Sequence, residues 1–128
     1  MEVYLGELGR FLDIVARKES ERVGVLIGTA FNERVVVNAV YPVRNVLQSK
    51  TEFLADPLDI ISSYKFSEAY GLDVVGLYHT HPLGGPIPSS KDFYGMKLWP
   101  IPWVIASKKG MKAWLLKGED LVEIKLIR

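Results

Sequence analysis

The residues best suited to chemistry in this sequence lie between positions 79 and 92. His79 and His81 are the only histidines among the 128 residues, and they lie two positions apart. Ser89 and Asp92 follow, which gives the spacing His-x-His-x(7)-Ser-x-x-Asp. Two imidazole nitrogens and one carboxylate oxygen are typical ligands of a catalytic zinc ion, which keeps its fourth position open for water. We therefore predict that His79, His81 and Asp92 bind one Zn²⁺ per chain.

The surrounding elements must bring these side chains together. Residues 73–79 are rich in apolar and β-branched types, which predicts a strand. Side chains two positions apart in a strand point to the same face, so the two imidazoles can reach one ion. The loop Pro-Leu-Gly-Gly-Pro-Ile-Pro that follows can fold a short helix at 90–97 back over the strand end. Ser89-x-x-Asp92 is also the pattern of a helix capping box, so the pair can cap the helix, serve the site, or do both.

A zinc ion of this kind lowers the pKa of its bound water to about 7, and the reaction still needs a proton acceptor that is not a ligand. Glu21 is our candidate for this general base, since it lies just before a predicted strand at 22–30. Two alternatives stay open: Glu19 and Glu33 are close in sequence, and Glu21 could be a solvated surface charge. Ser89 is a candidate donor to the oxyanion of a tetrahedral intermediate.

The remaining pattern predicts an α/β fold in which a mixed β-sheet is sandwiched by helices. Phe31-Asn-Glu-Arg34 is predicted to be the turn of a hairpin, and the last three strands are predicted to form a meander. Residues 42–56 are predicted to be irregular. Helices are predicted at 5–18, 57–70 and 90–97, and strands at 22–30, 34–41, 73–79, 103–107, 111–116 and 121–127.

Composition limits the classes of function. The chain has 16 basic and 15 acidic residues, a net charge of +1, so it has no basic field to hold nucleic acid or an anionic membrane. It has no cysteine, which excludes disulfides and thiolate chemistry. We find neither a signal peptide nor an apolar run long enough for a membrane helix, and we expect a cytoplasmic protein. One domain is expected over residues 1–128.

Together these motifs resemble the JAMM (MPN-plus) zinc metalloproteases. The resemblance runs from about residue 20 to 105, and it includes Asn45 and the helix that starts at Asp56-Pro57. The segments that carry it are Glu21-x-x-Gly24-x-Leu26-x-Gly28, then Gly76-Leu-Tyr-His-Thr-His-Pro82, and Ser89-x-x-Asp92. The chain has no room for the long insertions by which some eukaryotic members grip ubiquitin chains, which suggests a stand-alone prokaryotic type.

The resemblance implies a cytidine-deaminase-like fold and an isopeptidase that cleaves after the C-terminal glycine of a ubiquitin-like modifier. It implies His79, His81 and Asp92 as zinc ligands, Glu21 as general base, and Ser89 as oxyanion support. It also implies that segment 43–54 borders the cleft, although an ordinary connecting loop is an open alternative. Two other functions stay open: a hydrolase of sulfur-carrier-protein conjugates, and a non-catalytic MPN scaffold. A homodimer is a further expectation.

Overall fold

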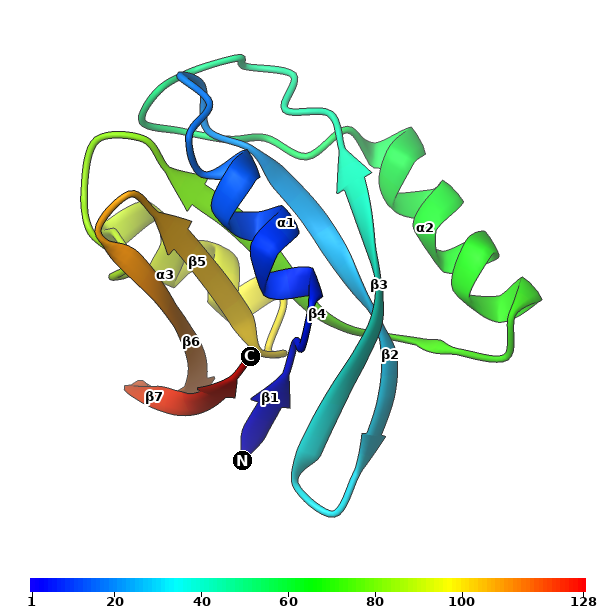
Figure 1. Ribbon diagram of the computed structural model, residues 1–128. Helices are drawn as coiled ribbons and strands as arrows, with labels where there is room; N and C mark the ends of the chain where they lie inside the picture. Colours follow the sequence, from blue (N-terminus) through cyan, green and yellow to red (C-terminus); the bar gives the residue numbers. More distant parts are fainter.

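Helices and strands follow each other as the sequence pattern predicts, with one additional strand at the N-terminus. The computed structural model describes residues 1–128 (Figure 1). The elements, in chain order, are β1 (Glu2–Tyr4), α1 (Leu8–Val15), β2 (Val23–Phe31), β3 (Arg34–Val43), α2 (Pro57–Ala69), β4 (Asp73–His81), α3 (Ser90–Leu98), β5 (Trp103–Ser107), β6 (Gly110–Lys117) and β7 (Asp120–Ile127). None of the three helices has the length and hydropathy needed to span a lipid bilayer.

The strands form one mixed sheet that closes on itself in the order β1-β3-β2-β4-β5-β6-β7. β2 runs antiparallel to both β3 and β4, β4 and β5 are parallel, and β5, β6 and β7 form the predicted meander. β1 pairs in parallel with both β3 and β7 and joins the two edges of the sheet. The sequence did not predict this strand, because three residues are too few to show an alternating pattern.

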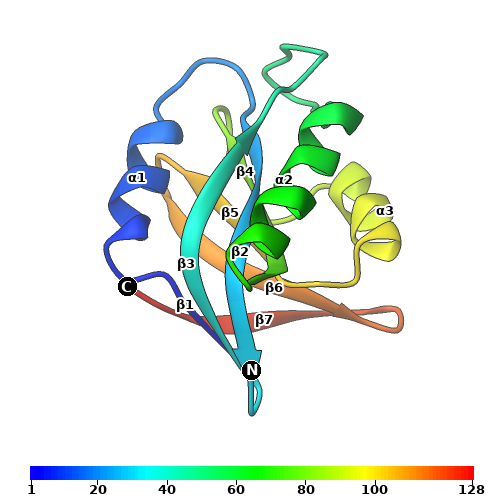
Figure 2. The ribbon, with the colours of Figure 1, turned by 90° about the vertical axis from the view of Figure 1, so that its right-hand side faces the viewer.

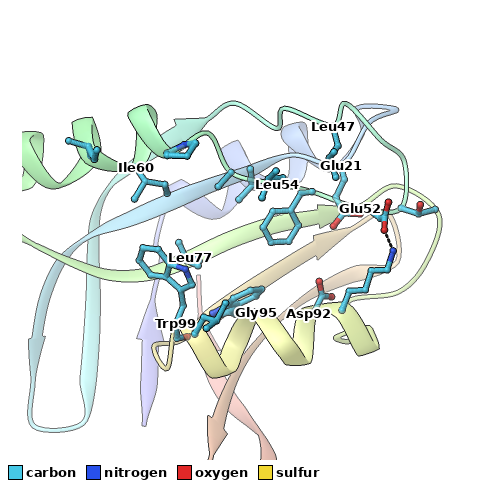
Figure 3. Close-up of a pocket in the computed structure, with 18 residues that line it drawn as sticks. Glu21, Leu47, Glu52, Leu54, Ile60, Leu77, Asp92, Gly95 and Trp99 are labelled. Carbon is cyan, nitrogen blue, oxygen red and sulfur yellow. Dashed lines mark hydrogen bonds and ion pairs between the residues drawn. The ribbon is translucent and has the colours of Figure 1, made fainter.

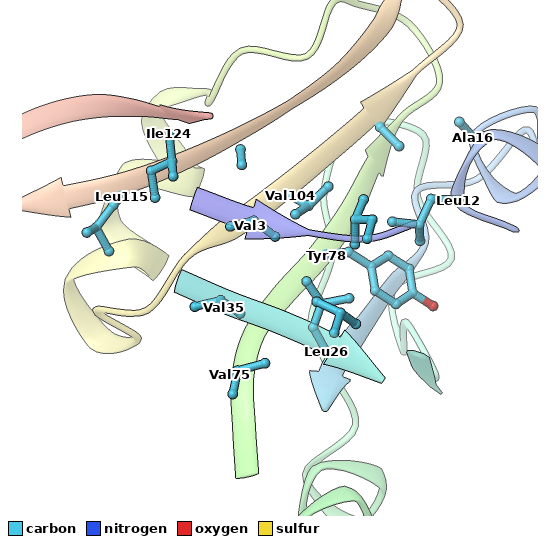
Figure 4. Packing of buried hydrophobic residues seen from close by; sticks show 14 residues of the cluster. Val3, Leu12, Ala16, Leu26, Val35, Val75, Tyr78, Val104, Leu115 and Ile124 are labelled. Atoms are coloured by element: carbon cyan, nitrogen blue, oxygen red, sulfur yellow. The ribbon is translucent and has the colours of Figure 1, made fainter. Parts of the chain in front are cut away.

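The helices cover the sheet from two sides. Figure 2 shows α1 on one side of the strands and α2 and α3 together on the other. Each side has its own apolar cluster. The larger one packs Leu12 of α1 against Leu26 and Val104 of the sheet (Figure 4), and the smaller one packs Met96 of α3 against Ile27 and Leu77. The α/β fold with helices on both faces of a mixed sheet is therefore confirmed.

Local signals explain where the helices begin and end. Asp56 caps α2 by accepting a hydrogen bond from the Leu58 N–H at 2.9 Å, and Pro57 occupies the first helical position. Gly71, with φ of +67°, ends the segment in the left-handed conformation that favours glycine. Helix α1 begins later than the predicted 5–18, because Gly6 is also left-handed, with φ of +56°, and holds the chain out of the helix until Leu8. It ends at Val15, three residues before the predicted end.

Two glycines of β2 are required by close packing within the sheet. A Cβ atom built on Gly24 would lie 2.2 Å from the ring of the buried Tyr78. A Cβ atom on Gly28 would lie 1.9 Å from the backbone oxygen of Val36. Both distances are far below van der Waals contact, so these glycines allow β2 to approach its neighbours.

Candidate active site

Four ionisable side chains meet at one end of the sheet. Glu21, His79, His81 and Asp92 each offer a ligand atom, and these atoms lie within 4.8 Å of one another. His79 and His81 are two positions apart at the end of β4, so both imidazoles point to the same face, and their Nε2 atoms are 3.0 Å apart. β4 is held in place by β2 on one side and β5 on the other.

The capping box at the start of α3 places Asp92. The Asp92 N–H donates to Ser89 Oγ at 3.1 Å, and the Ser89 N–H donates to Asp92 Oδ2 at 2.9 Å. The same Oδ2 atom lies 3.1 Å from His79 Nε2 and 3.0 Å from His81 Nε2. The aspartate therefore caps the helix and joins the cluster at once, as the sequence pattern allowed.

The donor set fits a divalent metal ion. The Nδ1 atom of His81 lies 2.9 Å from the Gly85 carbonyl oxygen, to which it donates its proton, so Nε2 is the nitrogen turned towards the cluster. Ligands at 2.0–2.1 Å around a tetrahedral zinc ion lie roughly 3.3 Å from each other. The separations of 3.0 and 3.1 Å among His79 Nε2, His81 Nε2 and Asp92 Oδ2 are close to this value.

The carboxylate of Asp92 and the surroundings of the two histidines set the charge of the cluster. Burial lowers the pKa of His79, which keeps this imidazole neutral. Burial opposes the charged form of Asp92, but the hydrogen bonds to His79 and His81 outweigh it and hold the pKa of the carboxyl well below its usual range. Burial also opposes the charge on His81, but the hydrogen bonds with Asp92 and the Gly85 carbonyl, together with the nearby carboxylates, outweigh it and raise the pKa of His81. Because an imidazole binds a metal in its neutral form, a cation bound here would displace a proton from protonated His81.

Glu21 lies slightly apart from the other three residues of the cluster. Its side chain is buried, and Oε1 lies 3.9 Å from His79 Nε2, farther out than the contacts among the other three residues. Burial raises the pKa of Glu21 to about 7, with a smaller opposing effect of His81. A cation bound beside the carboxylate would lower this pKa again. Of the alternatives, Glu33 lies at the opposite end of β2, next to the chain N-terminus.

An apolar groove of about 550 Å³ leads to the cluster (Figure 3). One wall is formed by residues 47–55 and the start of α2, and the other by α3 with Trp99. Glu21 and Asp92 line the end of the groove, where the cluster lies. Segment 43–54 therefore contributes to the cleft and is more than a connecting loop. An ion pair between Glu52 and Lys91 joins the two walls.

The sequence did not predict that several aromatic residues would gather in the groove beside the cluster. Trp99 lines the groove and stacks with Tyr64 at 6.4 Å between ring centroids. Phe53 and Trp103 pack their rings against His79, at 4.9 and 5.5 Å. No periodic pattern marks these aromatic residues as a group, because they come from three separate segments. Ser89 is exposed and lies outside the four-residue cluster.

Comparison with known proteins shows the family of this chain. Residues 11–117 match the family described as prokaryotic homologs of the JAB domain. A desampylase from Pyrococcus furiosus is 37% identical over 122 residues, which cover 94% of this chain and 84% of the relative. A probable TtuB-protein conjugate cleaving protease from Thermus thermophilus is 36% identical over 108 residues, which cover 83% of this chain and 69% of the relative.

Solved structures show the same fold. The solution structure of a protein from Desulfitobacterium hafniense matches 99% of this chain and 92% of its own, with a TM-score of 0.87 and 25% identity. A JAB1/MPN domain protein from Archaeoglobus fulgidus matches all of both chains, with a TM-score of 0.60 and 20% identity. The predicted resemblance to JAMM-type hydrolases is thus confirmed, and this chain belongs to the prokaryotic JAB-domain family.

Proposed function

We propose that this protein is a zinc-dependent isopeptidase that cleaves conjugates of a ubiquitin-like modifier after its C-terminal glycine. The observation that carries this proposal is the buried Glu21-His79-His81-Asp92 cluster at the end of an open apolar groove. The relatives support it, since their names describe a desampylase and a protease of TtuB-protein conjugates. Zinc is the proposed metal because two imidazoles and one carboxylate are its typical catalytic ligand set.

Each residue of the cluster has a proposed role. His79, His81 and Asp92 hold the metal, which when bound would lower the pKa of a water molecule to about 7 and polarise the scissile carbonyl. Glu21 accepts a proton from the attacking water and passes it to the lysine amine as the C–N bond breaks. The Oγ atom of Ser89 accepts the Asp92 N–H, so its own hydroxyl proton is free to donate to the oxyanion.

The groove supplies the orientation that this reaction needs. Its walls are mostly apolar and lie on either side of the path that leads to Glu21 and Asp92. An extended peptide advances about 3.3 Å per residue, so the last residues of a modifier tail can lie along the groove with the scissile carbonyl at the cluster. Residues of segment 47–55 line the groove and form the wall against which such a tail would lie.

Cleavage of a ubiquitin-like protein–lysine isopeptide conjugate tests the proposal. The zinc-loaded protein is expected to release the free modifier, to stop when a chelator is added, and to recover when zinc is returned. Elemental analysis of the purified protein is expected to give one zinc per chain. A protein that holds one zinc per chain and cleaves no conjugate or diglycine peptide would contradict the isopeptidase and support a non-catalytic scaffold.

The Thermus relative favours a second substrate, a conjugate of a sulfur-carrier protein, through the TtuB-protein conjugates that its name specifies. The same site would act on either modifier, because the chemistry at the isopeptide carbonyl is unchanged. Both conjugates are therefore assayed side by side with the same zinc-loaded enzyme. The ratio of the two kcat/KM values identifies the preferred modifier.

A further inference from the structure

The backbone of Glu21 is bound on both sides by the groove segment, defined here as residues 44–56. The Glu21 N–H donates to the Ser49 carbonyl oxygen at 2.6 Å. The Glu21 carbonyl oxygen accepts a hydrogen bond from Nδ2 of Asn45 at 2.9 Å. Glu21 precedes β2, so its own backbone hydrogen bonds are with the groove segment, while its neighbour Arg22 is bound to Thr80 of β4.

Asn45 is the centre of this arrangement, since its side-chain amide makes four hydrogen bonds. Nδ2 donates to the carbonyl oxygens of Glu21 and of Glu52, the latter at 3.1 Å. Oδ1 accepts the N–H groups of Leu47 at 3.1 Å and of Leu54 at 2.9 Å. An asparagine amide has two donor hydrogens and two acceptor lone pairs, so its capacity is filled. Asn45 thus closes the groove segment on itself and ties it to Glu21.

The groove segment also contacts the substrate path and the opposite wall. Leu47, Glu52 and Leu54 all line the groove and are all bound to Asn45 through their backbones. The Glu52 side chain forms an ion pair with Lys91 of α3, and the residue after Lys91 in that helix is Asp92. A peptide lying against this wall would therefore contact the groove segment, which is hydrogen-bonded through Asn45 to the backbone of Glu21.

We propose that Asn45 is a positioning residue: it fixes the backbone of Glu21 and so sets the carboxylate at the distance that proton transfer requires. This inference rests on the proposed function, in which Glu21 is the general base. Proton transfer depends steeply on geometry, and a misplacement of about 1 Å can reduce turnover roughly 100-fold. Fixing the backbone removes one source of such displacement.

The variant Asn45→Asp tests the link. A carboxylate retains acceptors for the Leu47 and Leu54 N–H groups but has no donor for the Glu21 and Glu52 carbonyl oxygens. We expect kcat on an isopeptide conjugate to fall roughly 10- to 100-fold, with KM within about threefold of wild type and zinc content unchanged. Asn45→Gln keeps the amide on a longer side chain and is expected to have an intermediate kcat.

Two reference variants make the result specific. Ser67→Ala removes a buried hydrogen bond to the Tyr64 carbonyl oxygen within α2, far from the groove segment, and controls for general loss of stability. Glu21→Gln tests the proposed function by itself. An inactive Glu21→Gln together with wild-type kcat in Asn45→Asp and Asn45→Gln would overturn the positioning role only. An active Glu21→Gln would overturn the role of Glu21 as base.

A purely structural role would also be recognised. In that case the activity of Asn45→Asp would fall in proportion to its zinc content or its folded fraction. The activity of Ser67→Ala would fall in the same proportion to its folded fraction. If Asn45→Asp does not fold, Asn45→Gln carries the test, because it introduces no charge. A fall in kcat for folded, zinc-loaded Asn45→Gln at unchanged KM would support the proposal, and wild-type kcat would overturn it.

Discussion

The double role of Asp92 leads to a prediction that separates helix capping from metal binding. Ser89→Ala removes the bond from the Asp92 N–H to Ser89 Oγ but leaves the carboxylate among the histidines. Loss of such an N-cap costs about 1 kcal/mol. With an unfolding entropy near 2.1 cal/mol/K per residue, a chain of 128 residues should lose about 4 °C in Tm. The loss should be equal with and without zinc.

Asp92→Ala should behave differently, because it removes one of three proposed ligands. Free zinc at 100 times its Kd stabilises a folded protein by about 2.7 kcal/mol, which corresponds to about 10 °C here. The assay is thermal unfolding of the wild type and both variants, each in chelator and in excess zinc. The wild type and Ser89→Ala should show this rise in Tm, whereas Asp92→Ala should lose most of it. An undiminished rise in Asp92→Ala would refute the ligand assignment.

Three further predictions concern the base, the groove and the sheet. Glu21→Gln should keep zinc, measured by elemental analysis, while kcat falls roughly 10²- to 10⁴-fold; retained turnover would assign the base elsewhere. Leu98→Asp places a charge on a groove residue that is 81% exposed, so KM for the conjugate should rise about tenfold while Tm stays nearly unchanged. An unchanged KM would indicate that the modifier tail binds to another surface. Gly28→Ala should cost about 3 kcal/mol in denaturant unfolding, because its Cβ meets the Val36 oxygen at 1.9 Å; a loss below about 1 kcal/mol would contradict this contact.

The elements that carry the site could be predicted because each has a strong local signal. Asp56-Pro57 marked the start of α2, and Ser89-x-x-Asp92 marked the start of α3, both within one residue of the structure. The apolar pattern at 73–79 located β4, whose last residues place both imidazoles. These features depend on neighbours in the sequence, which is why one chain suffices to find them.

The parts that could not be predicted depend on contacts between distant segments. The capacity of Asn45 to reach the Glu21 backbone is set by how the groove segment folds over the sheet. Phe53 and Trp103 surround His79 from separate parts of the chain. Apolar and polar residues follow each other without a regular period in the groove segment. Neither a helix pattern nor a strand pattern could therefore predict its conformation.

Closure of the sheet by β1 has a consequence for how the protein is made. Glu2 pairs with Lys125, and Tyr4 with Ile127, so the sheet can close only after the residues of β7 have been synthesised. Until β7 is in place, the outer edges of β1 and β6 are unpaired and can pair with other chains. Contacts of such long sequence separation also slow folding. A chain that stops before β7 would therefore be released with an open sheet, prone to associate at its unpaired edges.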